Sequence, residues 1–244
     1  MSAQNESGHA KNVANFEKLI TYVIGYGDAY APSNANIALS SLQAKAAEAH
    51  GSLEEVHSLL ANYNKSVGER SAAFAQLSKL STRVFNALKA SGATQAQIET
   101  AETHHRKLQG RRASARFSDE QKEQLAAQGQ DVRQVSASQL SFDSILDNLD
   151  KQIKFLTAAD VYAPNEADLQ VASLASLHSN LLQKNSTTVN QAATLSSARL
   201  KRDEVLNHPE TGMIALAANT KNYLKSIFGA TSPEYKLVSG IAIR

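Results

Sequence analysis

The chain has 244 residues, of which 42% are hydrophobic, and it contains four prolines and no tryptophan. Cysteine is absent, which excludes disulfides, thiolate metal sites and cysteine nucleophiles. The 25 basic and 23 acidic residues give a net charge of +2 and are spread along the chain, so nucleic acid and anionic membranes are disfavoured as partners. The abundance of Ala, Leu, Ser and Gln favours helices over sheets, and we expect an all-α fold.

Residues 1–12 (MSAQNESGHAKN) contain no apolar segment of the kind that a secretory signal needs. We therefore expect a disordered N-terminus over 1–12 and a cytoplasmic location. The best uncharged apolar stretch, 19–27, has nine residues, whereas a helix needs about 20 to cross a bilayer. A transmembrane segment is therefore not expected, and the sequence leaves the oligomeric state open.

Two decapeptides 132 positions apart are near copies: residues 28–37 read DAYAPSNANI and residues 160–169 read DVYAPNEADL. In each copy a proline turns the chain, and a polar residue that can cap a new helix follows it. An apolar residue four positions after the cap completes the spacing of a hydrophobic staple. We interpret both copies as helix corners with a packed tyrosine, and a binding role for the tyrosines is the alternative. The corner residues are Tyr30, Pro32 and Ser33 in the first copy, and Tyr162, Pro164 and Asn165 in the second.

A long run follows each corner, with apolar residues at every third or fourth position. In the first copy this spacing is regular from Leu39 to Val67, as in a heptad-patterned bundle or coiled coil. In the second copy it predicts a helix from Asn165 to about Leu206, ended by the turn NHPETG.

The regular spacing of the first run continues as far as Leu88, so periodicity alone does not show where the first long helix ends. The second copy is the guide, because there a long helix reverses into a shorter one. By analogy we predict a break between Tyr63 and Gln76, with Gly68 as the weakest point.

The flanks of the two decapeptides also match in order and spacing. They predict a tandem duplication of a three-to-four-helix unit, with a first helical repeat at 13–110 and a second at 138–244. We expect segment 111–137 to be a flexible polar linker with one short helix after Ser118, because it has few large apolar residues. The matching phases predict that both repeats pack through their long helices as one elongated bundle.

Residues 185–191 (NSTTVNQ) interrupt the leucine spacing of the second long helix. A solvated helix end, a polar core layer that fixes the register and the floor of a cleft would each explain this segment. We favour the polar layer.

Two Glu-x-x-His pairs raise the question of a metal site. In chain order Glu17, Glu54-x-x-His57, Glu69 and Glu102-x-x-His105 follow the pattern of ferritin-like di-metal bundles. Reversal near residue 30 would place Glu17 about 15 Å from Glu54 along the helix axis. Four ligands at different heights cannot share a metal pair, so we expect neither metal nor another cofactor.

Signatures of phosphate-binding loops, serine hydrolases and zinc proteases are absent from the sequence. We therefore expect no catalytic residues and a chain that is not an enzyme. Three tyrosines, Tyr22, Tyr26 and Tyr223, are expected to face outward and are the candidates for a binding surface.

The Tyr-Ala-Pro helix start, the variable middle and the ending NYLKSIFGATSPEYKLVSG at 222–240 carry a resemblance. In these features the chain resembles a group of uncharacterised all-helical proteins of similar length from Bacteroidota. The resemblance implies a bacterial source, and it implies no catalytic or binding residues.

The leading hypothesis is a non-enzymatic helical scaffold or protein-binding protein, since regular helical seams occur without catalytic motifs. The alternative is a membrane-active or toxin-like helical protein, because the apolar segment at 16–27 could rearrange on a lipid surface. A ferritin-like di-metal protein is third.

Overall fold

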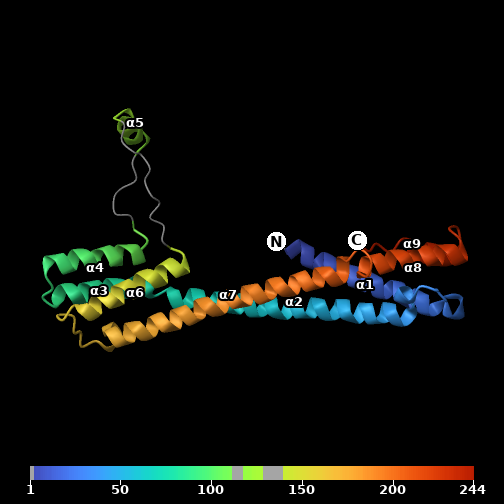
Figure 1. Ribbon diagram of the computed structural model, residues 1–244, viewed down its shortest axis with the longest axis horizontal. Coiled ribbons are helices and arrows are strands. Elements are labelled where there is room, and N and C mark those ends of the chain that lie inside the picture. Colours follow the sequence, from blue (N-terminus) through green and yellow to red (C-terminus); the bar gives the residue numbers. More distant parts are fainter. Residues whose placement is uncertain (1–2, 112–117, 129–139) are drawn as a thin grey trace. The chain divides into compact units, whose positions relative to one another are not determined.

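The computed structural model describes residues 3–111, 118–128 and 140–244, and every regular element in these ranges is a helix (Figure 1). The all-α prediction is thereby confirmed. Across these ranges, none of the helices combines the length and the apolar character that crossing a membrane requires. The α-helices are α1 (Ala3–Gly25), α2 (Leu39–Phe74), α3 (Leu77–Ala90), α4 (Gln95–Leu108), α5 (Asp119–Ala127), α6 (Phe142–Ala158), α7 (Val171–Asn207), α8 (Met213–Phe228) and α9 (Pro233–Ser239). The 3₁₀ turns are η1 (Gly27–Ala29), η2 (Ala35–Ile37) and η3 (Ala167–Leu169).

The chain divides into two compact units. Unit 1 consists of Met1–Asn64 and Asn190–Arg244, and unit 2 consists of Lys65–Val189. Helices α2 and α7 contribute residues to both units, so each unit combines segments of both predicted repeats. The predicted repeats at 13–110 and 138–244 thus differ from the compact units.

The core of unit 1 is built around the apolar face of α1. This helix lies against α8, and α9 packs on α8 (Figure 1). Because burial of a large apolar side chain contributes about 1.5–3 kcal/mol, this face is what holds α1 in place. The largest fully buried side chains of the unit are Phe16, Leu19, Val23, Leu42, Leu206, Met213 and Leu224. A smaller apolar cluster joins α2 to α7 through Val56, Leu195 and Ala198.

Unit 2 has a second apolar core, in which α4 packs against both α3 and α6. Its periodic leucines come from three helices and lie where the spacing of three or four residues predicts. The fully buried ones are Leu88 of α3, Leu149 and Leu156 of α6, and Leu174 and Leu181 of α7.

A buried polar layer crosses unit 2 at the polar interruption of α7. Asn185 accepts a hydrogen bond from Arg70 Nη1 at 3.0 Å and donates one to Asp143 Oδ1 at 2.7 Å. The hydroxyl of Thr188 donates to the carbonyl oxygen of Ser66 at 3.1 Å. A sliding of α7 along α2 would leave these buried groups without partners, at about 1–3 kcal/mol each. The arrangement agrees with the interpretation of residues 185–191 as a polar layer that fixes the register.

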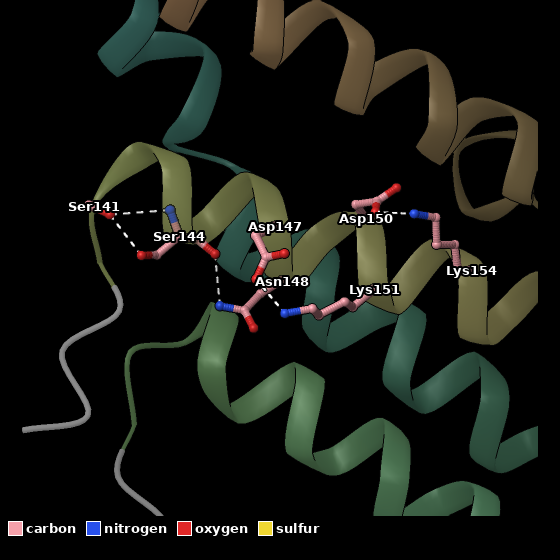
Figure 2. Close-up of polar contacts among 7 residues, drawn as sticks. All are labelled: Ser141, Ser144, Asp147, Asn148, Asp150, Lys151 and Lys154. Atoms are coloured by element: carbon pink, nitrogen blue, oxygen red, sulfur yellow. Dashed lines mark hydrogen bonds and ion pairs between the residues drawn. The ribbon is translucent and has the colours of Figure 1, made fainter. Parts of the chain in front are cut away.

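Helix α6 shows how local sequence sets a helix start (Figure 2). The side chain of Ser141 accepts a hydrogen bond from the N–H of Ser144 at 3.2 Å and caps the helix. One turn later, Asn148 Nδ2 donates to the carbonyl oxygen of Ser144 at 2.8 Å. Two exposed ion pairs four residues apart, Lys151–Asp147 and Lys154–Asp150, follow on the same helix. Exposed pairs of this kind are screened by solvent and contribute little, so α6 is held by its apolar face.

The first long helix ends at Phe74, inside the predicted range of 63–76 but not at Gly68. Helix α2 runs through Gly68, and α3 begins at Leu77. A glycine inside a helix costs about 0.5–1 kcal/mol relative to alanine, which the apolar packing of the flanking turns outweighs.

The prediction of a disordered segment over 1–12 is wrong for residues 3–12, because α1 already begins at Ala3. Two asparagines of α1 contact the last residues of the chain. The side chain of Asn12 bonds to both the backbone N–H and the carbonyl oxygen of Arg244, and Asn15 Nδ2 donates to Ala242 O at 2.7 Å. Contacts across more than 220 residues cannot be read from local composition.

The predicted linker at 111–137 is described only in part. Residues 112–117 and 129–137 lie outside the described residues. Between them, α5 (Asp119–Ala127) forms the short helix that was predicted after Ser118.

Two neighbouring histidines of unit 2, His104 and His105, have lowered pKa values. Burial lowers the pKa of His104, with Lys107 and Lys151 acting in the same direction. Burial also lowers the pKa of His105, whose Nδ1 lies 3.0 Å from the hydroxyl of Ser81. Arg111 adds to this lowering of the His105 pKa, and Glu102 opposes it.

We expect unfolding to become easier as the pH falls below the usual histidine pKa of about 6.5. The folded chain favours neutral rings, so protonation stabilises the unfolded chain and the contribution present at higher pH is lost in acid. Urea unfolding at pH 7.5 and pH 5.0 measures the effect, and the double variant His104→Gln/His105→Gln should show a smaller difference between the two pH values. An unchanged difference in that variant would contradict the assignment.

Candidate functional site

The first corner is organised by Tyr30. Its side chain is buried, and its hydroxyl donates to the carbonyl oxygen of Ile37 at 2.6 Å. The polar cap is not Ser33 as predicted: Asn34 Oδ1 accepts from the N–H of Asn36 at 3.0 Å, and Ser33 is exposed. The reason is that one 3₁₀ turn, η2, intervenes before α2 begins at Leu39. The packed tyrosine of the prediction is confirmed, and the position of its cap is corrected.

The second corner repeats this geometry in unit 2. Tyr162 is buried and donates to the carbonyl oxygen of Leu169 at 2.8 Å. Asn165, the predicted cap, is exposed, and the residue at the N-cap of η3 is Glu166. Helix α7 begins only at Val171. Burial, together with the charges of Glu166 and Asp168, raises the pKa of Tyr162 to about 12, so its hydroxyl stays a neutral donor near pH 7.

The prolines of the two decapeptides occupy the same place in both corners. Pro32 and Pro164 are half-buried, each two residues after a buried tyrosine. The apolar residues that end the decapeptides, Ile37 and Leu169, are buried. Each corner is therefore part of the apolar core of its unit, and its tyrosine is a packing residue that also satisfies a carbonyl oxygen.

Tyr22, Tyr26 and Tyr223 do not face outward, which corrects the prediction of an exposed aromatic surface. All three are half-buried and pack against the core of unit 1. The hydroxyl of Tyr26 donates to the carbonyl oxygen of Glu234 at 2.8 Å, and its ring lies 5.1 Å from that of Phe228. Phe228 of α8 and Glu234 of α9 cover Tyr26, and the periodicity of α1 alone could not reveal this cover.

A shallow groove runs between α1 and α2 in unit 1, and we call it the α1–α2 groove. It consists of two adjoining hollows of about 540 and 390 Å³. Buried Ile20 and Ala46 form its floor, and the exposed residues Ala47 and Gly51 leave room above them. The side chains at its rim are Glu17, His50, Glu54 and His57.

The groove corrects the expected position of Glu17 relative to Glu54. Glu17 lies in the same hollow as Glu54 and His57, and not about 15 Å along the axis from Glu54. The corner occupies residues 26–38, which shifts the level at which α1 meets α2. The remaining residues of the di-metal pattern, Glu69, Glu102 and His105, belong to unit 2.

The residues of the di-metal pattern in unit 2 have other partners. Glu69 accepts from Lys184 Nζ at 2.7 Å, and the ring of His105 stacks on Phe85 with centroids 5.1 Å apart. Within residues 3–111, 118–128 and 140–244, no three His, Asp or Glu side chains come together in a way that could hold a metal ion.

The α1–α2 groove has the physical character of a binding surface. Two carboxylates stand at its rim, and small residues allow the backbone of a ligand to approach closely. His50 Nδ1 lies 3.9 Å from Glu54 Oε1, so the rim also carries a group that is charged only when protonated. Sequence analysis missed the groove, although the small residues Ala46, Ala47 and Gly51 on neighbouring turns are a visible signal for it.

Comparison of the chain with protein-family models, with curated proteins and with solved structures finds no match. The resemblance to Bacteroidota proteins stays a prediction.

Replacement of Asn34 by alanine should lower the free energy of unfolding by about 0.5–2 kcal/mol, because the N–H of Asn36 loses its acceptor. Ser33→Ala is the matched control and should cost less than about 0.5 kcal/mol, as is usual at an exposed position. Urea titration of both variants measures the difference. If Ser33→Ala lowered the free energy of unfolding more than Asn34→Ala does, the capping residue would be Ser33.

Tyr30→Phe and Tyr162→Phe should each destabilise the chain by about 1 kcal/mol, since each removes one hydrogen bond and keeps the ring. Thermal unfolding monitored by circular dichroism tests this prediction. Two variants without any loss would show that the hydroxyl bonds do not hold the corners.

Proposed function

We propose that the chain is a non-enzymatic helical scaffold that binds another protein through the α1–α2 groove. The observation that carries this proposal is the groove itself, with an apolar floor, small residues above the floor and carboxylates at the rim. An amphipathic helix fits such a surface, because its apolar face can enter the groove while its flanks meet the rim.

The negative charge at the rim of the groove favours a partner with basic side chains. Glu17 and Glu54 stand on opposite helices at the rim, so a helix with Lys or Arg beside its apolar face complements them. Gly51 adds space for close approach, since a Cβ at this position would meet no atom within 4 Å beyond its chain neighbours and the nearby backbone of its own helix. The occupant that we propose is therefore a basic amphipathic helix of a partner protein.

The membrane-active alternative depends on the apolar face at residues 16–27. In unit 1 the side chains of Phe16, Leu19 and Val23 on this face are buried in the core. Lipid contact through this face would require unit 1 to open. The packing therefore supports the scaffold over the membrane-active alternative.

We also infer that the scaffold arose by tandem duplication. This inference is supported by two corners with the same tyrosine-to-carbonyl bond across seven residues. It is supported further by the equivalent packing of η2 on α8 and of η3 on α3. A cytoplasmic location is part of the same proposal and rests on the sequence alone.

A displayed library of helical peptides, selected on the full chain, tests the groove. We expect enriched peptides to carry an apolar face flanked by Lys or Arg, and Gly51→Trp should weaken their binding about tenfold or more by filling the groove. Gly68→Trp is the matched control, because Gly68 also lies within α2 and a Cβ there meets nothing within 4 Å. Equal binding to both variants would rule out the groove.

Elemental analysis and turnover assays test the non-enzymatic part of the proposal. The purified chain should contain no stoichiometric metal, and Glu54→Ala and His57→Ala should not change its metal content. A stoichiometric metal that either variant loses would support the di-metal alternative instead.

A further inference from the structure

The two corners have the same frame, so they can be compared residue by residue. The corners lie 132 positions apart in sequence, and the helices that cover them, α3 and α8, begin 136 positions apart at Leu77 and Met213. On this register Tyr223 of α8 corresponds to Ala87 of α3. The neighbouring pairs agree in burial, because Thr220 and Val84 are both buried, and so are Leu224 and Leu88.

In unit 1 the first corner is closed by Tyr223. Its ring stands edge-on to the ring of Tyr30, with centroids 5.3 Å apart and an angle of 86° between the planes. Its hydroxyl oxygen accepts a hydrogen bond from the N–H of Ala31 at 3.2 Å. The corner thus holds a p-hydroxyphenyl group by one aromatic contact and one backbone donor.

In unit 2 the same place is open. Ala87 contributes only a methyl group where Tyr223 contributes a ring, and a hollow of about 560 Å³ lies there. Ala90 adds apolar surface, and Tyr162 and Ala163, the counterparts of Tyr30 and Ala31, also line the hollow. Within the described residues, the N–H of Ala163 donates to no backbone carbonyl oxygen.

The charges around the hollow favour a neutral ligand. Arg83 lines it, but its guanidinium forms a two-point ion pair with the carboxylate of Asp168. Glu166 also lines the hollow and places a negative charge near Tyr162. With the arginine already paired, a phosphorylated or carboxylated ring gains no free cation there, and an uncharged phenol meets no repulsion.

We propose that the hollow at the second corner binds an uncharged p-hydroxyphenyl group, with its ring between Ala87 and Tyr162 and its oxygen on the N–H of Ala163. The group is the side chain of a tyrosine in a partner chain or a free phenol. This site lies in unit 2 and stands independently of the α1–α2 groove in unit 1, so failure of one leaves the other intact.

Titration with p-cresol, followed by amide nuclear magnetic resonance of the full chain, tests the proposal directly. We expect the Ala163 amide to shift with a Kd on the order of 1 mM, since so small a ligand has few atoms to contribute. Toluene, which lacks the hydroxyl, should bind about fivefold more weakly. No shift at Ala163, or equal binding of toluene, would overturn the proposal.

Two variants exchange the corners. Ala87→Tyr should fill the hollow with a tyrosine of the chain itself and abolish the p-cresol shift at Ala163. Tyr223→Ala should open the first corner and produce a second p-cresol site that shifts the Ala31 amide. If Ala87→Tyr does not fold, the titration of the unaltered chain still decides, and retained p-cresol binding in a folded Ala87→Tyr would contradict the site.

A comparison of N-acetyltyrosinamide with p-cresol separates the two sources of the group. Tighter binding of the amide would assign the hollow to a tyrosine of a partner chain, since the backbone then adds contacts. Tighter binding of p-cresol would assign it to a free phenol. N-acetylphosphotyrosinamide should bind less tightly than N-acetyltyrosinamide, and the reverse order would contradict the neutral ligand.

Discussion

A tyrosine hydroxyl that donates to a carbonyl oxygen seven residues further on sets the start of each long helix. A buried hydroxyl without an acceptor costs about 1–3 kcal/mol, so the chain between donor and acceptor has to close into one 3₁₀ turn. Helices α2 and α7 can begin only after that turn, at Leu39 and Val171. From there the spacing of three or four residues decides which side chains enter the cores. The register of both long helices therefore depends on the hydrogen bond of the corner tyrosine.

The sequence could predict those parts of the fold that depend on local order. The helix-favouring composition predicted the all-α fold, the repeated decapeptide predicted the packed tyrosines, and the polar interruption at Asn185 predicted the polar layer. Each of these features is encoded within a few turns of helix. The break of the first long helix could be placed only by analogy with the second copy, and the helix ends at Phe74, inside the predicted range of 63–76.

The sequence could not predict features that depend on distant segments. Tyr26 and Tyr223 looked exposed on their own helices, but the partners of Tyr26 are Phe228 and Glu234. The order of residues 3–12 depends in the same way on contacts with the last residues of the chain, such as that of Asn12 with Arg244. The position of Glu17 along α2 was predicted wrongly, because the number of residues that the corner takes up depends on its folded conformation. The α1–α2 groove was missed for the same reason.

The sharing of α2 and α7 between the units has a consequence for how the chain can be divided. A cut between the predicted repeats would leave α1 without α8, and α6 without α3 and α4. Neither half could then complete an apolar core, although each would keep its corner and its long helix. Two such fragments would be expected to stay unfolded apart and to assemble as an obligate pair when mixed. In this architecture the covalent link between the halves raises their local concentration. The packing of the helices determines the specificity of their association.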